Sequence, residues 1–355
     1  MNVSSKHSAC CSTCKAGGPW VHTLIERPVI RLATRGSPLA LWQAKRVAAL
    51  LDRAGADASL VVVETDGDRQ VDVPLEQLGG QGVFVKEVQS AVVRGDADAA
   101  VHSAKDLPAS AAHGVPGLVL AAIPERADVR DVLVGGGVES LPTGATVATG
   151  SARRRVQLAY LRPDLTFTGL RGNLATRLAT AGQGDIAAVV VAKAAIDRLG
   201  WFPPEGLEIE VLEPELMVPQ VGQGALAVEC RTDDEATRAL LAVIDDPTGR
   251  PLVEAERAYL AELGGGCTMP VGALASWAEG DTAAGAGAAS LRLTGMMGSA
   301  DGLIVLRHTE AGRQPGELGR AVARYLLDEA GGYDLGEWVL SLEDGNPGGP
   351  SPVVA

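Results

Sequence analysis

The stretch IRLATRGSPLALWQAKRVAALLDRAG, residues 30–55, predicts a short strand followed directly by a helix. The strand covers Ile30 to Ala33. Ser37 is placed to cap the helix, a proline fits its first turn, and Gly55 ends it. A second strand, LVVVET, begins at Leu60 and is apolar enough to be buried. This succession of strand, helix and strand indicates an α/β layer with a mainly parallel sheet.

The next segments continue the alternation. A helix is expected in VFVKEVQSAVVRG and a strand in DAAVHS, which runs straight into Lys105 and Asp106. Parallel sheets bind ligands at the carboxyl ends of their strands. We therefore expect Lys105 and Asp106 to lie where a ligand binds.

From about Asp131 the same pattern starts again. The expected strands are ATVATG, LTFTGL and DIAAVVV, and the expected helices are SARRRVQLAYL, NLATRLATAG and AKAAIDRLG. This predicts a second α/β domain of similar size. A further strand, GALAVEC, follows at residues 224–230 and is free to return to the first domain.

The last third of the chain has another pattern. It predicts a helix in VEAERAYLAEL, alternating strands in SLRLTGMMGS and LIVLRHTEAG, and a helix in ELGRAVARYLLDEAGG, which is typical of a small α+β domain with an antiparallel sheet. The expected division is a disordered leader 1–28, a first domain 29–125 with 222–243, a second domain 126–221, a third domain 244–345, and a disordered tail 346–355.

The composition excludes several classes of protein. A formal net charge of −13 argues against nucleic-acid binding, as does the small number of aromatic residues, five Trp, four Tyr and three Phe. No apolar run approaches the length of a membrane span. The first residues lack the apolar core of a secretory signal, so we expect a cytoplasmic protein without a membrane partner.

The five cysteines do not form a disulfide framework, since their number is odd and three lie close together near the N-terminus. Cys10, Cys11 and Cys14 have metal-like spacing with His7 nearby, but without a second ligand pair they make a weak zinc signal, and we expect no metal site. Cys230 lies in an apolar strand pattern and is expected to be a core residue.

Cations gather between Ser151 and Gly200. This stretch contains eight Lys and Arg residues and three Asp residues, so its net charge is +5, whereas that of the whole chain is −13. Arg153 and Arg154 fall in the first turn of a helix, where the dipole disfavours cations. A bound carboxylate or phosphate explains this placement, because guanidinium groups and helix N–H groups then share one anion. The alternative is an ordinary basic surface.

Two more strand ends carry polar side chains. Arg35 and Ser37 repeat the arrangement in the first domain and indicate a second anion site, which would face the cleft expected between the two domains. Asp106, among these cations, is expected to stay ionised and to stabilise positive charge or to move a proton. Its alternative role is that of a turn residue before Leu107 and Pro108.

The stretch LGGGCTMPVGA, residues 263–273, places Cys267 behind three glycines. A core thiol would lie in an apolar strand or helix, and a zinc ligand would have partners nearby. A nucleophile fits best, because glycines leave the sulfur accessible to another reactant. Without a neighbouring histidine, a thiol that forms one lasting bond to a carrier is favoured over a protease-like pair.

Together these motifs resemble the porphobilinogen deaminase family, also called hydroxymethylbilane synthases. The matching segments occur in the family's order over about residues 29–345, and they are RLATRGSPLALWQA, the GDxxxDxPL spacing from Gly67 to Leu75, GGQGVFVKE, AVHSAKDLP, GSARRRVQL, LRGNLATRL, VGQGALAVECR and GGCTMPVGA. The resemblance implies two doubly wound domains like those of periplasmic solute-binding proteins and a small α+β C-terminal domain. It also implies head-to-tail condensation of four porphobilinogen molecules, with release of ammonia, for tetrapyrrole synthesis.

The resemblance also implies roles for individual residues. Cys267 matches the cysteine that holds a dipyrromethane cofactor through a thioether. Asp106 matches the aspartate that assists ammonia loss and stabilises positive pyrrole and azafulvene intermediates. The implied cofactor-binding residues are Lys105, Asp106, Thr149, Ser151, Arg153, Arg154, Arg171 and Arg177, and the implied substrate-binding residues are Arg35, Ser37, Arg171, Arg177 and Arg198. A monomer that passes its product to uroporphyrinogen-III synthase is implied as well.

The sequence departs from the family pattern at five positions. Asp66, Gln77 and Gln81 replace residues that are commonly basic, Arg155 replaces a common glutamine, and Gly264 replaces a glutamate. Two other protein classes stay open on the residues alone. One is a solute-binding protein for anions, and the other is a pyridoxal-phosphate enzyme with Lys105 as its Schiff-base lysine.

Overall fold

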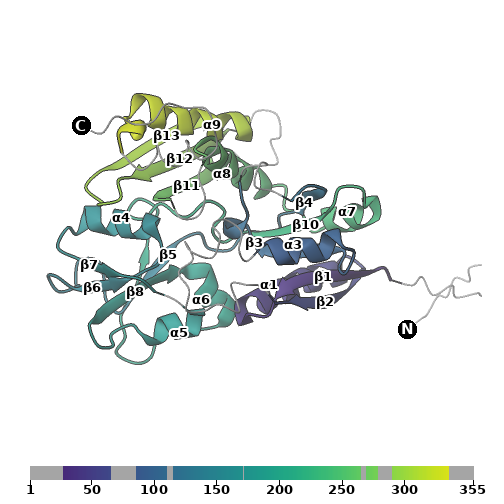
Figure 1. Cartoon of the computed structure of the whole chain (residues 1–355), viewed down its shortest axis with the longest axis horizontal. Coiled ribbons are helices and arrows are strands. Elements are labelled where there is room, and N and C mark those ends of the chain that lie inside the picture. The colour runs from purple at the N-terminus through teal and green to yellow at the C-terminus, as the bar shows by residue number, and fades with distance from the viewer. Residues whose placement is uncertain are drawn as a thin grey trace, which may run out of the picture.

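The computed structural model describes residues 27–64, 85–109, 115–170, 172–264, 269–278 and 290–335. Three sheets, each with its own helices, form three regions of the molecule (Figure 1). The expected tail, the N-terminal cysteine cluster and nearly all of the expected leader lie outside the described residues, as do Asp66, Gln77 and Gln81.

The first sheet has five strands in the order β2-β1-β3-β10-β4. Its strands are β1 Val29–Arg35, β2 Asp57–Val63, β3 Ala99–Ser103, β4 Leu118–Ala122 and β10 Leu226–Arg231. β1 is parallel to β2 and β3, whereas β10 is antiparallel to both of its neighbours. The strand expected in GALAVEC is β10, so the chain returns to this sheet after residue 212.

The second sheet has the order β7-β6-β8-β5-β9. Its strands are β5 Asp131–Val134, β6 Thr146–Ala148, β7 Thr166–Thr168, β8 Ile186–Ala192 and β9 Ile209–Leu212. Again a single strand, β5, is reversed, and it occupies the position that β10 has in the first sheet. Both sheets are therefore mainly parallel and built to one plan, which confirms the predicted α/β class.

The helix quoted at the start of the sequence forms as predicted. Helix α1, Pro38–Arg53, is capped by Ser37, whose side chain accepts a hydrogen bond from the amide of Ala40. The chain leaves the helix through Gly55, which has a φ of +89° and needs the freedom of glycine. The other helices of the two α/β regions are α3 Lys86–Val93, α4 Ala152–Leu161, α5 Leu174–Ala179, α6 Lys193–Leu199 and α7 Glu235–Ala242.

The prediction that LVVVET is buried was wrong. This segment belongs to β2, which is the edge strand of the first sheet, and Val62 is 55% exposed. The apolar run forms a strand because β-branched residues favour the extended backbone. Its position at the edge leaves one side of β2 without a neighbouring strand among the described residues.

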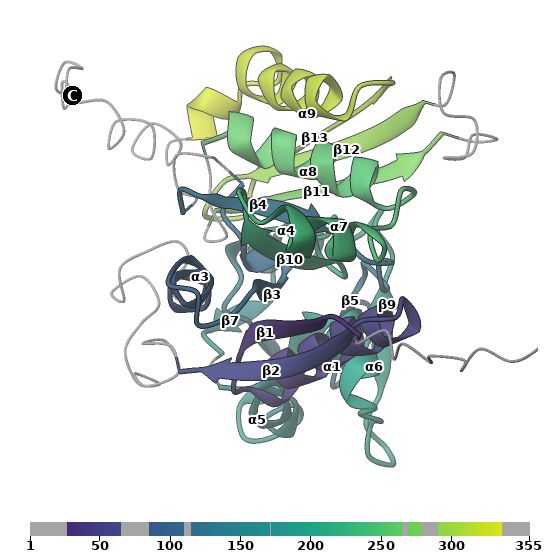
Figure 2. The same ribbon diagram turned by 90° about the vertical axis from the view of Figure 1, so that its right-hand side faces the viewer.

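The third region packs two long helices against an antiparallel sheet (Figure 2). The strands are β11 Val271–Trp277, β12 Leu291–Gly298 and β13 Val305–Gly312, and the helices are α8 Arg250–Glu262 and α9 Pro315–Arg324. The predicted α+β class of this region is confirmed, although β11 was not among the expected strands. Tyr259 is fully buried in the core and donates a hydrogen bond to the carbonyl oxygen of Met296 (2.9 Å).

Two of the departures from the family pattern have local explanations. Gly264 follows α8 with a φ of +66°, a left-handed conformation that favours glycine just after a helix. Arg155 on α4 donates a hydrogen bond to the carbonyl oxygen of Ala300 (3.3 Å), so it joins the second region to the turn between β12 and β13.

Candidate active site

Two connections join the α/β regions, residues 123–130 from β4 to β5 and residues 213–225 from β9 to β10. Register places Asp131, the first residue of β5, opposite Ala192, the last of β8. Leu226 likewise lies opposite Ser103. Both connections therefore run between the carboxyl ends of the parallel strands, and these two edges face each other, which is where α/β sheets bind ligands.

Lys105 and Asp106 lie on a short 3₁₀ turn, Ala104–Asp106, that directly follows β3. Ala104 and Leu107 are buried on either side of the pair and fix the turn to the core. Asp106 is exposed and Lys105 is half-buried. The turn thus presents a carboxylate and an ammonium at the edge that faces the second region.

Arg153 and Arg154 converge on a buried carboxylate. Arg153 Nη2 donates to Asp131 Oδ2 (2.7 Å), and Arg154 Nη2 donates to Asp131 Oδ1 (2.7 Å). Arg153 Nη1 donates to the carbonyl oxygen of Val218 (2.7 Å), and Arg154 Nη1 donates to that of Val190 (3.0 Å). The anion beside these helix-terminal cations is therefore supplied by the chain itself, and the sequence analysis did not identify it.

Asp131 is charged in this setting. Burial by itself would raise the pKa of its carboxyl group, but the two guanidinium groups of Arg153 and Arg154 outweigh burial and hold that pKa well below its ordinary value. The three side chains are fully or almost fully buried. They form a fixed cluster with one positive charge in excess, which favours anions at the adjoining surface.

Gln223 connects this cluster to the turn of Asp106. Its Nε2 donates to Asp131 Oδ1 (2.9 Å) and to the carbonyl oxygen of Val129 (2.8 Å), while its Oε1 accepts from Lys105 Nζ at 3.5 Å. Its backbone carbonyl accepts from Arg126 Nε (2.8 Å). Gln223 therefore joins the two connections to each other. It also joins the Asp131 cluster to the turn that carries Lys105 and Asp106. Sequence analysis missed it, although it lies inside the quoted motif VGQGALAVECR.

A buried ion pair links the third region to the connection between β4 and β5, next to Gln223. Arg126 donates two hydrogen bonds to Glu256 of α8, at 2.7 and 3.0 Å, and Glu256 is fully buried. The carboxylate also accepts from the backbone amides of Gly222 (2.8 Å) and Ala275 (3.0 Å). All three regions are thus held together beside Gln223.

The charge of Lys105 depends on its neighbours. Burial, helped by the charges of Arg154 and Arg153 and opposed by those of Asp106 and Asp131, lowers the pKa of Lys105 to about 8. At neutral pH the ammonium form still predominates. Lys105 is therefore a cation whose charge is lost under mildly alkaline conditions.

Thr149 and Ser151 form the entry to α4. Ser151 caps the helix, its side chain accepting from the amide of Arg154 (3.5 Å), and its own amide donates to Thr149 Oγ1 (3.2 Å). Both residues follow β6 at the edge that faces the first region. Their hydroxyl groups lie next to the positive end of the helix dipole, a favourable place for an anion.

The other predicted binding residues lie on several different elements. Arg35 ends β1 and Ser37 caps α1. Arg177 lies on α5 and donates to the carbonyl oxygen of Gly172 (2.9 Å). Arg171 and Cys267 lie outside the described residues.

Arg198 forms a contact between the two α/β regions. It is 8% exposed, its guanidinium lies over the ring of Trp42 on α1 (5.7 Å to the centroid), and Nη2 donates to the carbonyl oxygen of Gly224 (2.6 Å). Burial lowers its pKa to about 10, so it stays positively charged at neutral pH.

We expect Asp131→Asn to destabilise the fold strongly, because it leaves two buried guanidinium groups facing a neutral amide. Removing one partner of a buried ion pair typically costs about 3–5 kcal/mol in the free energy of unfolding. Urea unfolding followed by circular dichroism measures the change. Asp164→Asn is the matched control, since Asp164 pairs with Arg162 at the surface (2.7 Å) and its loss should matter little. Equal unfolding midpoints for the two variants would contradict this account of Asp131.

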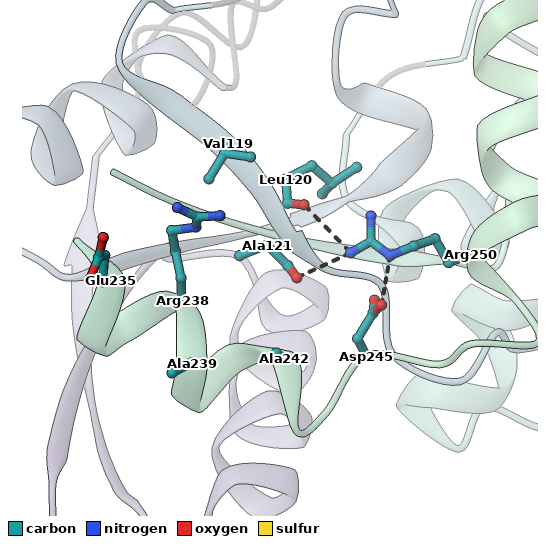
Figure 3. A pocket seen from close by; sticks show the side chains of 9 residues that line it. All are labelled: Val119, Leu120, Ala121, Glu235, Arg238, Ala239, Ala242, Asp245 and Arg250. Atoms are coloured by element: carbon teal, nitrogen blue, oxygen red, sulfur yellow. Dashed lines mark hydrogen bonds and ion pairs between the residues drawn. The ribbon is translucent and has the colours of Figure 1, made fainter. Parts of the chain in front are cut away.

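A separate groove of about 620 Å³ lies between β4 and α7, lined by Val119, Leu120, Ala121, Glu235, Arg238, Ala239, Ala242, Asp245 and Arg250 (Figure 3). Arg250 lies at one side of the lining residues in Figure 3 and is held by Asp245 (2.6 Å) and by the carbonyl oxygen of Ala121 (3.0 Å). Since none of the predicted site residues lines this groove, its chemistry is distinct from that of the cleft.

In the described part of the chain, no helix is both long and apolar enough to cross a membrane. The same residues contain no group of three or more His, Cys, Asp or Glu side chains arranged to hold a metal ion. Cys230 is a fully buried free thiol, as predicted, and burial raises its pKa to about 11.

A family model described as "Porphobilinogen deaminase, dipyromethane cofactor binding domain" matches residues 30–239. A second, "Porphobilinogen deaminase, C-terminal domain", matches residues 251–328. The chain belongs to the porphobilinogen deaminase family. The second range contains Cys267, and the first contains all the other site residues predicted from the sequence.

Curated relatives agree over nearly the whole chain. A protein named porphobilinogen deaminase from Syntrophus aciditrophicus (strain SB) is 44% identical over 325 residues, which are 90% of this chain and 100% of the relative. Another of that name, from Roseiflexus castenholzii (strain DSM 13941 / HLO8), is 44% identical over 315 residues, 87% and 99% of the two chains. Among solved structures, the methionine-binding protein MetQ covers 66% of this chain and 93% of its own at 14% identity, with a TM-score of 0.39.

Proposed function

We propose that this protein is a hydroxymethylbilane synthase, which condenses four porphobilinogen molecules head to tail on a dipyrromethane cofactor and releases ammonia at each step. The observation that carries the proposal is the exposed Asp106 carboxylate, placed beside Lys105 at the edge where both sheets face each other. Membership of the porphobilinogen deaminase family supplies the reaction. When bound, the dipyrromethane supplies the primer to which pyrrole units are added.

The residues present suit a group that carries several carboxylates. The Nε atoms of Arg153 and Arg198 are buried and have no hydrogen-bond acceptor among the described residues. The Asp131 cluster carries one excess positive charge, and Lys105 adds another. A donor-rich, cationic site of this kind matches acetate and propionate side chains.

We propose that Cys267 holds the cofactor covalently, and that the residues contacting it are Lys105, Asp106, Thr149, Ser151, Arg153, Arg154, Arg171 and Arg177. Arg35, Ser37, Arg171, Arg177 and Arg198 would bind the carboxylates of the incoming substrate. For Arg153 and Arg154 this role adds to their pairing with Asp131, which orients both guanidinium groups. The hydroxyl groups of Thr149 and Ser151 offer short-range donors at the start of α4.

Asp106 would act on the reacting part of porphobilinogen. As ammonia leaves the aminomethyl carbon, positive charge develops on the substrate, and a carboxylate nearby stabilises it. The same carboxylate can accept the proton that the pyrrole loses when the new bond is complete. Lys105 lies next to Asp106 on the same turn and adds a positive charge to this part of the site.

Lys105 should give the enzyme a characteristic pH dependence. Its pKa of about 8 means that the ammonium is present at lower pH and is lost as the pH rises through that value. Because the ammonium attracts the carboxylates of porphobilinogen, we expect KM to rise about tenfold between roughly pH 7 and 9. Lys105→Arg keeps its charge over this range and should show a flat profile. Superimposable KM profiles for the two proteins would refute this role.

Ammonia release separates the proposed function from anion binding alone. The purified protein, incubated with porphobilinogen, should release one ammonia for each porphobilinogen consumed and form hydroxymethylbilane. A solute-binding protein would retain the compound unchanged. Binding without ammonia release would therefore overturn the proposal.

Further statements about the protein belong to the same proposal. We propose three domains, residues 29–125 with 222–243, 126–221 and 244–345, and the membership of the strands in three separate sheets supports this division. The family resemblance supports a cytoplasmic monomer whose product is passed to uroporphyrinogen-III synthase.

A further inference from the structure

Helix α8 of the third region packs against the turn that carries Asp106. Val253 of α8 packs in one apolar cluster with Ala104 and Leu107, the buried residues on either side of Lys105 and Asp106. This cluster fixes the base of the turn. It does not by itself fix the segment that follows.

Arg257 provides the polar part of the same contact. It lies four residues after Val253 and therefore on the same face of the helix. Its Nη2 donates a hydrogen bond to the carbonyl oxygen of Pro108 (2.8 Å), two residues after Asp106. In the described structure this is the only hydrogen bond between α8 and residues 104–109.

A buried polar cluster orients Arg257. Its guanidinium is attracted by Glu229 of β10, which also accepts a hydrogen bond from Gln89 Nε2 (2.8 Å) and lies 3.3 Å from His102 Nε2. The Glu229 carboxylate is held in place by Gln89 of α3 and His102 of β3. Arg257 therefore has a fixed anion in its surroundings in addition to its hydrogen bond with the backbone after Asp106.

We propose that Arg257 is a positioning residue for Asp106. Helix α8 ends at Glu262, shortly before the segment that contains Cys267. A helix is stiff along its axis, with a rise of about 1.5 Å per residue. The hydrogen bond from Arg257 thus ties the turn of the catalytic carboxylate to the helix that leads into the cofactor-attachment loop. This inference rests on the proposed role of Asp106.

Arg257→Met and Arg257→Lys test the inference. The methionine variant keeps the apolar stem and removes the donor, whereas lysine restores one charged donor. We expect kcat per dipyrromethane-bearing chain to fall at least tenfold in Arg257→Met, KM to change less than about threefold, and kcat to recover partly in Arg257→Lys. Arg324→Met is the matched control, because Arg324 contacts α8 through Glu262 (2.6 Å) and not the turn.

Hydrogen exchange supplies a readout that does not depend on the reaction. In Arg257→Met, exchange of amides in the segment 104–109 should accelerate about tenfold, while the cores of the three sheets keep their protection. Unchanged exchange in this segment, or acceleration spread over the whole chain, would overturn the inference. An Asp106→Ala variant with full activity would instead refute the proposed catalytic role of Asp106 and leave the exchange result standing.

Discussion

Asp106→Ala is expected to fold normally and to turn over porphobilinogen very slowly. Asp106 is exposed and no described residue depends on it for packing, so the free energy of unfolding should change little. Loss of a group that stabilises developing charge and moves a proton typically lowers kcat by about 100- to 10,000-fold. The rate of ammonia release, divided by the dipyrromethane content of the sample, measures this effect.

Asp233→Ala is the matched control for the loss of an exposed carboxylate, because Asp233 lies beyond β10 and away from the cleft. We expect its kcat to equal that of the unaltered protein. If Asp106→Ala retained more than about half of that kcat, the catalytic role of Asp106 would be refuted.

Cys267→Ser should abolish both the covalent cofactor and the activity. A serine hydroxyl is a far weaker nucleophile than a thiolate, so the lasting bond to the dipyrromethane would not form. We expect no detectable dipyrromethane by reaction with Ehrlich's reagent and no ammonia release. Cys230→Ala is the control, since that thiol is buried and its pKa is raised to about 11, which makes it unreactive. A cofactor-bearing, active Cys267→Ser protein would refute this attachment.

Local features of the fold were predictable because they depend on neighbouring residues. Ser37 caps α1, as its position ahead of a periodic apolar segment predicted, and Ser151 and Asn173 cap α4 and α5 by the same kind of side-chain contact. The edge position of β2 was not predictable in this way. It depends on which strands pair, and the pairing is decided by tertiary packing.

The contacts of Arg153 and Arg154 at the site also depend on tertiary packing, so the sequence could not predict them in full. The residues of α4 predicted a bound anion, and that stays a prediction. The structure adds an anion of the chain itself, Asp131, which pairs with Arg153 and Arg154 because β5 lies beside β8 in reversed direction. Likewise, Gln223 and Lys105 are more than a hundred residues apart in the sequence. They come into contact because the chain returns to the first sheet as β10, next to β3.

The mass of the intact protein before and after addition of porphobilinogen tests whether a dipyrromethane on Cys267 serves as the primer. We expect the purified chain to exceed its sequence mass by one dipyrromethane, located on the peptide that contains Cys267, and porphobilinogen to add successive pyrrole units, each with loss of one ammonia. An active chain with its sequence mass alone, or with the added mass on another peptide, would contradict this expectation.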